Sequence, residues 1–277
     1  MWAERVFQKL VWLGQRVPAP LRIALTRLPM AAWLRQLSQM PRGGPVIVRL
    51  NGLLRGYRMR LDLRAGHRRF ALGTYEPEIA ALIQTTLQRG EIAMDIGANI
   101  GYFTLLMARQ VGPAGRVIAF EPLPSVYAAL CENLRLNDLH WAQAECRAVA
   151  DHDGEARIWS EAGNPLSFTA RLAEEGDLVV PTVSIDRYIE VADLARLDFV
   201  KIDVEGAEDA VIRGMTDTLQ KIRPVVLLEI HANDGRESEG LRRLKEAGYK
   251  LMRAEKDGLL PCDTRTRREH VVGWWRS

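Results

Sequence analysis

Residues 92–104 read IAMDIGANIGYFT, an apolar run that passes into a glycine-containing turn and then into a helical pattern. The apolar run predicts a buried strand over residues 92–96, and the apolar spacing after Tyr102 predicts a helix. Gly97 would let the backbone turn tightly, and Gly101 would let the helix approach the sheet. We expect the turn to leave backbone N–H groups facing a ligand.

The same alternation of apolar run and helical stretch recurs along the chain and indicates βαβ units. Further strands are predicted at residues 116–120, 141–149, 199–204 and 225–230. This alternation predicts an α/β fold with a doubly wound parallel sheet that helices cover on both faces. Ligands of such sheets bind beyond the carboxyl ends of the strands, so we expect the site there.

The end of the second predicted strand indicates the class of ligand. Glu121 lies 20 residues after Gly101, where a carboxylate can accept hydrogen bonds from both hydroxyls of a ribose. Asn99 occupies the position of the central glycine in a dinucleotide fingerprint, so its side chain would crowd the pyrophosphate of NAD. S-adenosylmethionine carries an amino-acid tail in place of phosphates and suits the turn. A tight β-to-α turn without a ligand is the alternative.

Acidic side chains and a histidine gather at two later strand ends. Period-two alternation places Lys201, Asp203 and Glu205 on one side of the fourth strand. Glu229 and His231 come at the exit of the fifth strand. Buried parallel strands rarely carry such residues without a reason. The alternatives are that Asp203 or Glu205 caps the following helix and that His231 is an ordinary loop histidine.

Composition indicates a globular protein of a reducing compartment. The 277 residues are 47% hydrophobic and 26% charged. Cys131, Cys146 and Cys262 are odd in number and form no CxxC pair, which disfavours a disulfide framework and a thiolate zinc site. Early charges such as Glu4 interrupt any apolar export signal, and no apolar stretch in the basic N-terminal region reaches the roughly 18 residues of a membrane span. We therefore expect a cytoplasmic location.

Charge divides the chain unequally. Residues 1–70 hold 14 lysines and arginines against two acidic residues, although the whole chain has a net charge of only +3. Residues 1–44 read as a basic amphipathic helical extension, and residues 1–40 could lie on an anionic membrane surface or pack on their own domain. Nucleic acid is a disfavoured partner, because no aromatic-interleaved RNA motif accompanies the basic residues. Residues 45–90 predict a short β segment and a lead-in helix, and 91–277 the main domain.

Several motifs together resemble the FkbM-type methyltransferases, which are class I enzymes that use S-adenosylmethionine. The similar segments are residues 73–77 (GTYEP), 95–104, 120–122 (FEP) and 201–208 (KIDVEGAE), within a resemblance over roughly residues 45–275. The resemblance implies a Rossmann-like, mostly parallel sheet of seven strands whose last strand is antiparallel. It also implies the following cofactor-binding residues: Asp95, Gly97, Ala98, Asn99, Gly101, Tyr102, Thr104, Glu121, Pro122 and Asp203.

Methyl transfer to a hydroxyl needs a group that removes the hydroxyl proton. The catalytic candidates are His231, whose ordinary pKa is near neutrality, then Asp203, together with Glu205. A divalent ion held by acids is the alternative, but carboxylates so close in sequence are more often a cluster at a helix N-terminus, so we expect no metal. The resemblance gives Tyr75 and Glu76 a role over the cofactor or in the acceptor pocket. Residues 157–181 predict a loop that closes over the acceptor, or a β-hairpin.

Three classes of function fit these patterns. The first is O-methylation of a sugar, glycan or secondary metabolite, which is what most characterised relatives of the resembled family carry out. The second is an RNA or protein methyltransferase that holds a polymer with its basic extension. The third is a binding protein that keeps the nucleoside pocket without catalysis. We expect the first, because the turn and the strand ends carry a complete set of polar side chains.

Overall fold

The computed structural model describes residues 44–62, 67–160, 170–172, 176, 178–231, 237–255, 258–262, 264 and 269–275. Residues 1–43 lie outside the described part of the chain, so the basic helical extension and its contact with membranes remain predictions. The same holds for residues 161–169 of the predicted closing loop. None of the described helices is long and apolar enough to cross a membrane.

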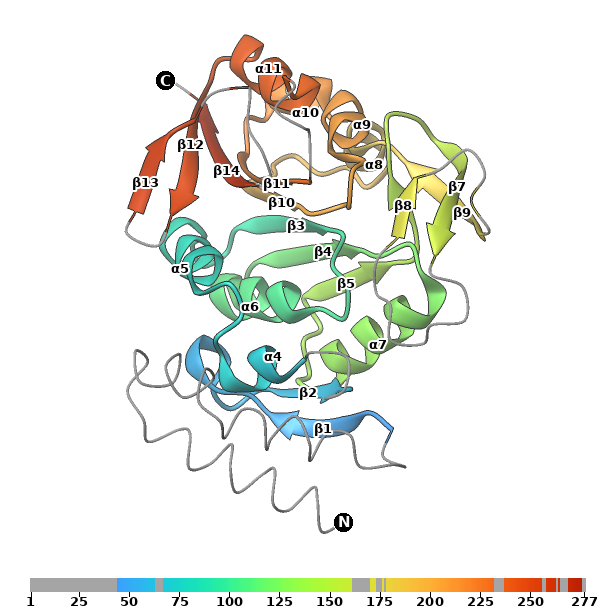
Figure 1. The fold of residues 1–277 in the computed structure, drawn as a ribbon, viewed down its shortest axis with the longest axis vertical. Coiled ribbons are helices and arrows are strands. Elements are labelled where there is room, and N and C mark those ends of the chain that lie inside the picture. The colour runs from blue at the N-terminus through green and yellow to red at the C-terminus, as the bar shows by residue number, and fades with distance from the viewer. Residues whose placement is uncertain are drawn as a thin grey trace.

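A mostly parallel sheet forms the centre of the molecule (Figure 1). Its parallel strands are β5 (Ala142–Glu145), β4 (Arg116–Phe120), β3 (Ile92–Ile96), β10 (Phe199–Ile202) and β11 (Val225–Ile230), in that order across the sheet. The antiparallel strand β14 (Glu269–Trp275) follows, and then β12 (Tyr249–Glu255) and β13 (Gly258–Pro261). The predicted α/β fold is confirmed, and the described part of the chain gives its central sheet eight strands instead of seven. The additional strand is β13, an exposed partner of β12 at the edge.

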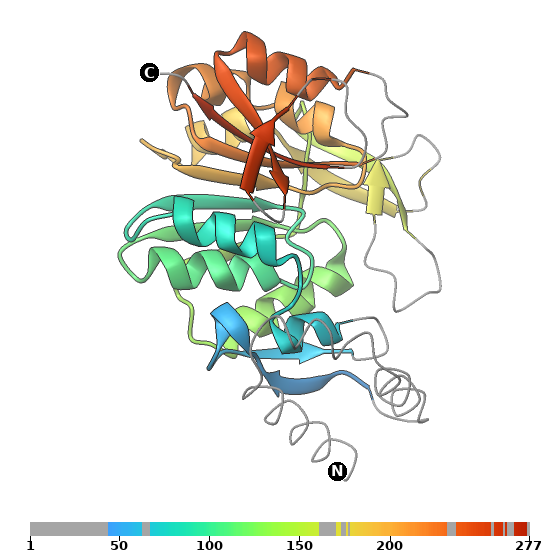
Figure 2. The same cartoon turned by 60° about the vertical axis from the view of Figure 1, so that its left-hand side comes forward.

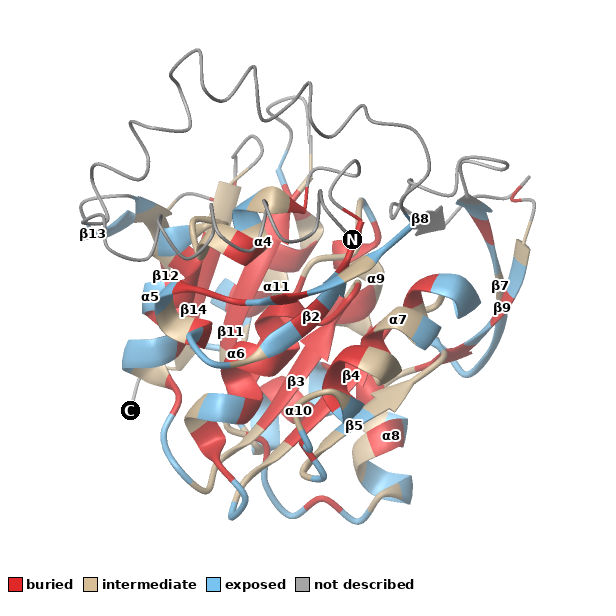
Figure 3. Ribbon diagram, turned by 90° about the horizontal axis from the view of Figure 1, so that it is seen from below, coloured by how far each residue is buried: buried red, intermediate tan, exposed pale blue. Residues whose placement is uncertain are grey.

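Helices cover both faces of this sheet (Figures 1 and 2). One face carries α5 (Pro77–Thr86), α6 (Tyr102–Val111) and α7 (Pro124–Arg135), and the other carries α8 (Ile185–Val191), α9 (Glu208–Arg213), α10 (Thr216–Lys221) and α11 (Glu239–Glu246). Side chains alternate between the two apolar layers, since Ala93 packs with the first group and Met94 with the second. Buried residues accordingly run along the central strands and the inner sides of the helices (Figure 3).

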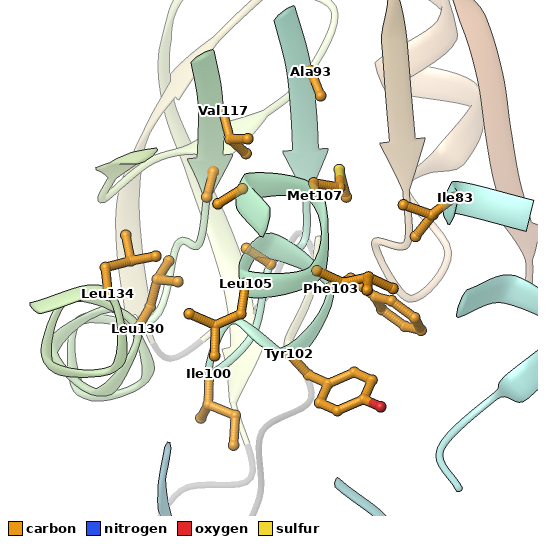
Figure 4. Packing of buried hydrophobic residues seen from close by; sticks show 14 of the residues in the cluster. Ile83, Ala93, Ile100, Tyr102, Phe103, Leu105, Met107, Val117, Leu130 and Leu134 are labelled. Atoms are coloured by element: carbon orange, nitrogen blue, oxygen red, sulfur yellow. The ribbon is translucent and has the colours of Figure 1, made fainter. Parts of the chain in front are cut away.

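Helix α6 sits at the centre of one apolar layer (Figure 4). Its Leu105 and Met107 are fully buried, and Leu130 of α7 and Ile83 of α5 belong to the same cluster. A Cβ on Gly101 would lie 2.5 Å from the Cδ1 atom of Leu130. Gly101 therefore lets α6 begin close to α7, whereas the sequence predicted an approach to the sheet.

The segment before the main sheet shares this apolar layer. Strands β1 (Val46–Arg49) and β2 (Arg58–Leu61) pair antiparallel, with the 3-10 helix η1 (Gly52–Leu54) between them and the short helix α4 (Arg68–Leu72) after them. Two asparagines of the α7 region accept hydrogen bonds from backbone N–H groups of β2. Asn133 Oδ1 lies 2.7 Å from the nitrogen of Arg60, and Asn137 Oδ1 lies 2.8 Å from that of Arg58. The domain boundary at residue 91 stays a prediction, and one apolar cluster spans it.

The strand predicted over residues 141–149 is wrong as a single element, because the chain leaves the main sheet within it. Residues 142–145 form β5, and β6 (Ala148–Val149) belongs to a second sheet of four strands. The other strands of that sheet are β9 (Leu178–Val183), β7 (Gly154–Ser160) and β8 (Ala170–Leu172). Strand β7 pairs antiparallel with both β8 and β9, which favours the β-hairpin alternative for this region.

Candidate active site

A pocket opens at the carboxyl ends of β3, β4, β10 and β11, where the topology of the sheet predicts it. The predicted site residues in its lining are Tyr75, Glu76, Gly97, Ala98, Asn99, Tyr102, Glu121, Pro122, Asp203 and Glu205. Four predicted residues, Asp95, Gly101, Thr104 and His231, lie outside that lining. The second sheet supplies part of the opposite wall through Ile158 and Val149.

The turn after β3 is held so closely that only glycine fits at its first position. Gly97 has a φ of +80°, and a Cβ there would lie 1.8 Å from the carbonyl oxygen of Asp203. The nitrogens of Gly97 and Ala98 donate to the carbonyl oxygen of Phe120, over 3.0 and 2.9 Å. Asn99 has a φ of +52°, a conformation that asparagine tolerates better than most residues.

The N–H groups of residues 97–101 are already hydrogen-bonded within the protein, so the expectation of free N–H groups is not met at these five positions. Besides the two N–H groups that Phe120 accepts, the N–H of Asn99 donates to Glu121, that of Ile100 to the side chain of Asn99, and that of Gly101 to Ala98. These bonds make the turn rigid.

Glu121 is a buried carboxylate directly after β4. Only 4% of its surface is exposed, and it accepts hydrogen bonds from the backbone N–H groups of Asn99 (2.9 Å) and Leu123 (3.0 Å). Burial raises the pKa of Glu121 to about 7, and the two backbone hydrogen bonds offset part of that rise. Each carboxylate oxygen keeps further capacity to accept a hydrogen bond, which suits the two hydroxyls of a ribose.

Lys201 joins two carboxylates beneath the pocket. Its Nζ lies 3.0 Å from Asp203 Oδ2 and 3.8 Å from Asp95 Oδ1, and only 3% of the residue is exposed. Burial alone would lower the pKa of Lys201, but the two carboxylates outweigh it and raise the pKa. Thr104 donates to Asp95 Oδ2 over 2.6 Å, and Asp95 Oδ1 has no hydrogen-bond partner among the described residues. Asp95 therefore keeps a buried acceptor atom beside the cofactor turn.

The acids after β10 do not follow the predicted alternation. Strand β10 ends at Ile202, and Glu205 has a φ of +49°. Asp203 and Glu205 both line the pocket, and so does Val204, which the period-two pattern placed on the opposite side. The capping alternative is also wrong, because Ala207 occupies the N-cap of α9 and no side chain caps that helix. The acids are thus directed into the site by an irregular backbone.

His231 lies among four carboxylates, which answers the alternative that it is an ordinary loop residue. Its Nδ1 is 2.7 Å from Glu208, and its Nε2 is 3.3 to 3.7 Å from Glu229, Glu205 and Asp203. Burial alone would lower the pKa of His231, but hydrogen bonds to Glu208 and Glu229 outweigh it and raise the pKa to about 10. The surrounding carboxylates thus favour the charged form of the imidazole, and the role of a base for His231 stays a prediction.

Comparison with known proteins places this geometry in one family. The family model described as "Methyltransferase FkbM domain" matches residues 95–251. The chain belongs to the FkbM methyltransferase family. The match begins at Asp95, at the end of β3, and takes in the cofactor turn and the acids after β10. Membership of this family identifies S-adenosylmethionine as the methyl donor.

Three curated relatives illustrate the similarity of this FkbM-family chain to known proteins. The hexuronic acid methyltransferase AglP of Haloferax volcanii is 28% identical over a match that covers 57% of this chain and 63% of AglP. The 31-O-demethyl-FK506 methyltransferase FkbM of Streptomyces tacrolimicus is 30% identical over 62% of this chain and 77% of the relative. The 2-O-methyltransferase NoeI of Sinorhizobium fredii is 29% identical over a match that covers 59% of this chain and 75% of NoeI.

A histidine that sequence reasoning did not single out contacts two acids that line the FkbM-family pocket. His270 Nε2 lies 3.1 Å from Glu229 Oε2 and 3.6 Å from Glu76 Oε2. The pairing of β14 with β11 sets His270 opposite Glu229. Burial alone would lower the pKa of His270, but the hydrogen bond and charge of Glu229 raise it. A correct prediction of the antiparallel pairing of β11 with β14 would have identified His270 as a neighbour of Glu229.

Phe70 is a second pocket residue that sequence reasoning missed. It lies in α4, with ring centroids 4.4 Å from Tyr75 and 4.9 Å from Tyr102. Phe103 completes the group, 5.8 Å from Tyr75. The predicted placement of Tyr75 at the pocket agrees with this aromatic cluster. The segment before the main sheet thus contributes directly to the FkbM-family site.

Proposed function

We propose that this protein transfers the methyl group of S-adenosylmethionine to a hydroxyl of a sugar, glycan or secondary metabolite. The observation that supports the proposal is that three acids line one pocket. Glu121 is suited to bind a ribose, and Asp203 and Glu205 lie in the same lining. A nucleoside end and a hydroxyl-binding end can therefore be occupied together. When bound, S-adenosylmethionine supplies an electrophilic methyl group on a sulfonium sulfur.

We assign the cofactor end to the turn after β3 and the residue after β4. Glu121 accepts hydrogen bonds from the ribose hydroxyls, and the turn from Gly97 to Gly101 shapes the wall beside it. The unpartnered Oδ1 of Asp95 is a buried acceptor that suits the ammonium group of an amino-acid tail. The aromatic faces of Phe70, Tyr75 and Tyr102 offer an environment that attracts a cation.

We assign the removal of the hydroxyl proton to the carboxylates after β10. The reaction forms a bond between the acceptor oxygen and the methyl carbon while the sulfur–carbon bond breaks, and the hydroxyl proton must leave the oxygen. Asp203 and Glu205 line the pocket and can accept it. His231 is charged in this arrangement, so its proposed role is to position these carboxylates.

The acceptor class follows from the polar character of the pocket. Ionised carboxylates accept hydrogen bonds and donate none, so Glu76, Asp203 and Glu205 favour a partner rich in hydroxyl groups. The relatives named for a hexuronic acid and for an O-demethylated natural product support the same class. We therefore propose O-methylation of a polyhydroxylated acceptor.

Calorimetric titration of the purified protein with S-adenosylmethionine, S-adenosylhomocysteine and NAD tests the proposal. We expect both sulfur ligands to bind and NAD not to bind, because Asn99 lies where a pyrophosphate needs glycine. Transfer of a labelled methyl group to a panel of glycans and lipid-linked sugars then identifies the acceptor. Failure of both sulfur ligands to bind would overturn the proposal. Methyl transfer to RNA or protein alone would overturn the acceptor class.

We also propose that residues 1–40 bring the enzyme to an anionic membrane surface from the cytoplasm. Residues 1–40 contain six of the 14 basic residues found among residues 1–70, together with three tryptophans, and this supports the proposal. Co-sedimentation with vesicles containing phosphatidylglycerol should fall when residues 1–40 are deleted, and vesicles of neutral phosphatidylcholine serve as control. Unchanged binding of the deleted form would refute the membrane contact.

A further inference from the structure

The hairpin of β1 and β2 has one buried side and one basic, exposed side. Its buried side belongs to the apolar layer around α6. Residues opposite each other in an antiparallel pair lie on the same side, and the register sets residue 47 opposite residue 60 and residue 49 opposite residue 58. The exposed side, which we call the hairpin face, therefore consists of Ile47, Arg49, Arg58 and Arg60.

Two arginines of the hairpin face lie directly opposite each other. Arg49 of β1 pairs in register with Arg58 of β2, and like charges at such a cross-strand position destabilise the pair. The guanidinium group of Arg58 donates to the carbonyl oxygen of Leu136 over 2.6 Å, which leaves its charge in place. Neither arginine has an ion pair within the part of the chain that the structure describes. An anion that contacts both guanidinium groups would relieve this repulsion.

The surroundings of this arginine pair are also basic, and partly apolar. Arg60 has an ion-pair partner, Glu132, 2.6 Å away, and the Arg60 side chain is 44% exposed. Ile47, opposite Arg60, is an aliphatic residue that is also 44% exposed. The described residues 44–62 and 67–72 contain six arginines and one acidic residue, and that acid is buried. The hairpin face thus combines an excess of positive charge with an exposed aliphatic side chain.

We infer that the hairpin face binds the anionic headgroup surface of a lipid bilayer. Such a surface offers phosphate groups side by side, and Ile47 can enter the boundary between headgroups and acyl chains. Nucleic acid also offers phosphates, but proteins that hold single strands add aromatic side chains on which the bases stack, and none of the four residues is aromatic. Strand β1 begins at Val46, so in sequence the predicted basic extension leads directly into the hairpin face.

The hairpin is joined to the pocket through α4, and the consequence for the acceptor rests on the proposed function. The backbone nitrogen and the Nδ2 atom of Asn51, which follows β1, both donate to the carbonyl oxygen of Ala71 over 3.2 Å. Ala71 belongs to α4, and so does Phe70, which lines the pocket. A bilayer held at the hairpin face is therefore connected to the α4 wall of the pocket by one short segment, which suits a lipid-linked acceptor.

Co-sedimentation of the full-length protein with vesicles of phosphatidylglycerol and phosphatidylcholine tests the hairpin face. Arg49→Gln combined with Arg58→Gln should weaken binding about 25-fold, because each arginine near an anionic bilayer contributes about fivefold. The matched control combines Arg187→Gln with Arg242→Gln, which removes the same charge from exposed positions in α8 and α11. Helix α11 lies at the other end of the molecule from β1 (Figures 1 and 2). An equal loss in both double variants, or no loss in the first, would overturn the inference.

The stability of a single variant tests the arginine pair itself. Without vesicles, Arg49→Gln should leave the midpoint of urea unfolding unchanged or raise it, because the substitution removes a like-charge pair. The same measurement shows that the variant is folded. A clear fall of the midpoint would mean that Arg49 serves the fold, and would overturn the inference.

Arginine modification of the unchanged protein covers the case in which a variant does not fold. Phenylglyoxal modifies exposed guanidinium groups, and mass spectrometry reports the extent at each arginine. Phosphatidylglycerol vesicles should protect Arg49 at least fivefold and leave Arg242 unprotected. Protection of Arg49 by single-stranded RNA but not by vesicles would overturn the inference, and so would vesicle binding that leaves Arg49 fully reactive.

These results separate the hairpin face from the other proposed properties. Vesicle binding that is lost on deletion of residues 1–40 but unchanged in the Arg49 and Arg58 double variant refutes the hairpin face alone. Absence of vesicle binding in the unchanged protein refutes both membrane contacts. The titration with S-adenosylmethionine needs no vesicles, so its failure would refute the proposed methyl transfer and leave the vesicle measurements valid.

Discussion

The carboxylate of Glu121 accepts a hydrogen bond from the backbone N–H of Asn99 over 2.9 Å, which ties the end of β4 to the turn after β3. The same bond leaves the carboxylate at the pocket wall, beside Pro122. One side chain therefore fixes the cofactor turn and presents an acceptor to the ligand. Replacement of Glu121 should affect both properties, and the two effects can be measured separately.

Glu121→Gln should weaken S-adenosylmethionine binding by about 10- to 100-fold, because a hydrogen bond to a charged group contributes roughly 1.5–3 kcal/mol. Calorimetric titration measures the affinity. Glu190→Gln is the matched control, since that side chain is 71% exposed and its ion pair with Arg187 lies on the surface. Equal affinities of the two variants would contradict the role of Glu121.

Binding of S-adenosylmethionine should depend on pH through the same residue. The pKa of Glu121 is raised to about 7 by burial, so a proton occupies the carboxylate below this pH and competes with the ribose hydroxyls. If only the ionised form binds, the dissociation constant at pH 6 should be about tenfold higher than at pH 8. Titrations at both values check this, and Glu121→Gln should abolish the dependence. A flat profile in the unmodified protein would show that ionisation of Glu121 does not govern binding.

Gly97→Ala should destabilise the protein more than Gly90→Ala, although both glycines have nearly the same φ of +80° and +79°. A Cβ at position 90 meets no atom within 4 Å, whereas one at position 97 would lie 1.8 Å from the carbonyl oxygen of Asp203. Gly90→Ala should cost about 1–2 kcal/mol from the left-handed backbone. Gly97→Ala should cost a further 1–3 kcal/mol or so from the clash. Urea unfolding measures both, and equal values would contradict the close approach.

Lys201→Met should lower the free energy of unfolding by about 3–5 kcal/mol, because it leaves Asp95 and Asp203 without their shared buried cation. Lys221→Met is the matched control. Its side chain is 69% exposed and pairs with Asp217 on the surface, so its loss should have a much smaller effect. Urea unfolding at neutral pH compares the two. A small effect at Lys201 would mean that water replaces the lysine.

The parallel strands were predictable because each is a short apolar run bounded by turn residues. Residues 92–96, 116–120 and 225–230 form strands at the predicted bounds. The prediction of one strand over residues 141–149 failed because the chain changes sheets after Glu145. An apolar pattern indicates that a residue is buried, but it does not indicate to which sheet the residue belongs. Periodicity likewise could not locate the end of β10. The strand stops at Ile202, and the backbone turns left-handed at Glu205.

The candidate site was predictable where the residues lie close together in sequence, as in the turn from Asp95 to Thr104. It was not predictable where distant strands meet. His270 reaches Glu229 through the register of an antiparallel pair that no local pattern specifies. The raised pKa of His231 likewise depends on acids of the segment after β10, Glu208 among them, and on Glu229 of β11. Such electrostatic effects arise only from the assembled tertiary structure.

The attachment of β2 to the α7 region has a consequence for synthesis on the ribosome. The N–H groups of Arg58 and Arg60 find their acceptors on Asn137 and Asn133, 79 and 73 residues later in the chain. At usual translation rates those acceptors emerge about 4–15 s after the hairpin does. Throughout that interval the nascent hairpin lacks the helix that completes its apolar layer. Its docking must therefore wait until β3 and β4 of the central sheet have been made.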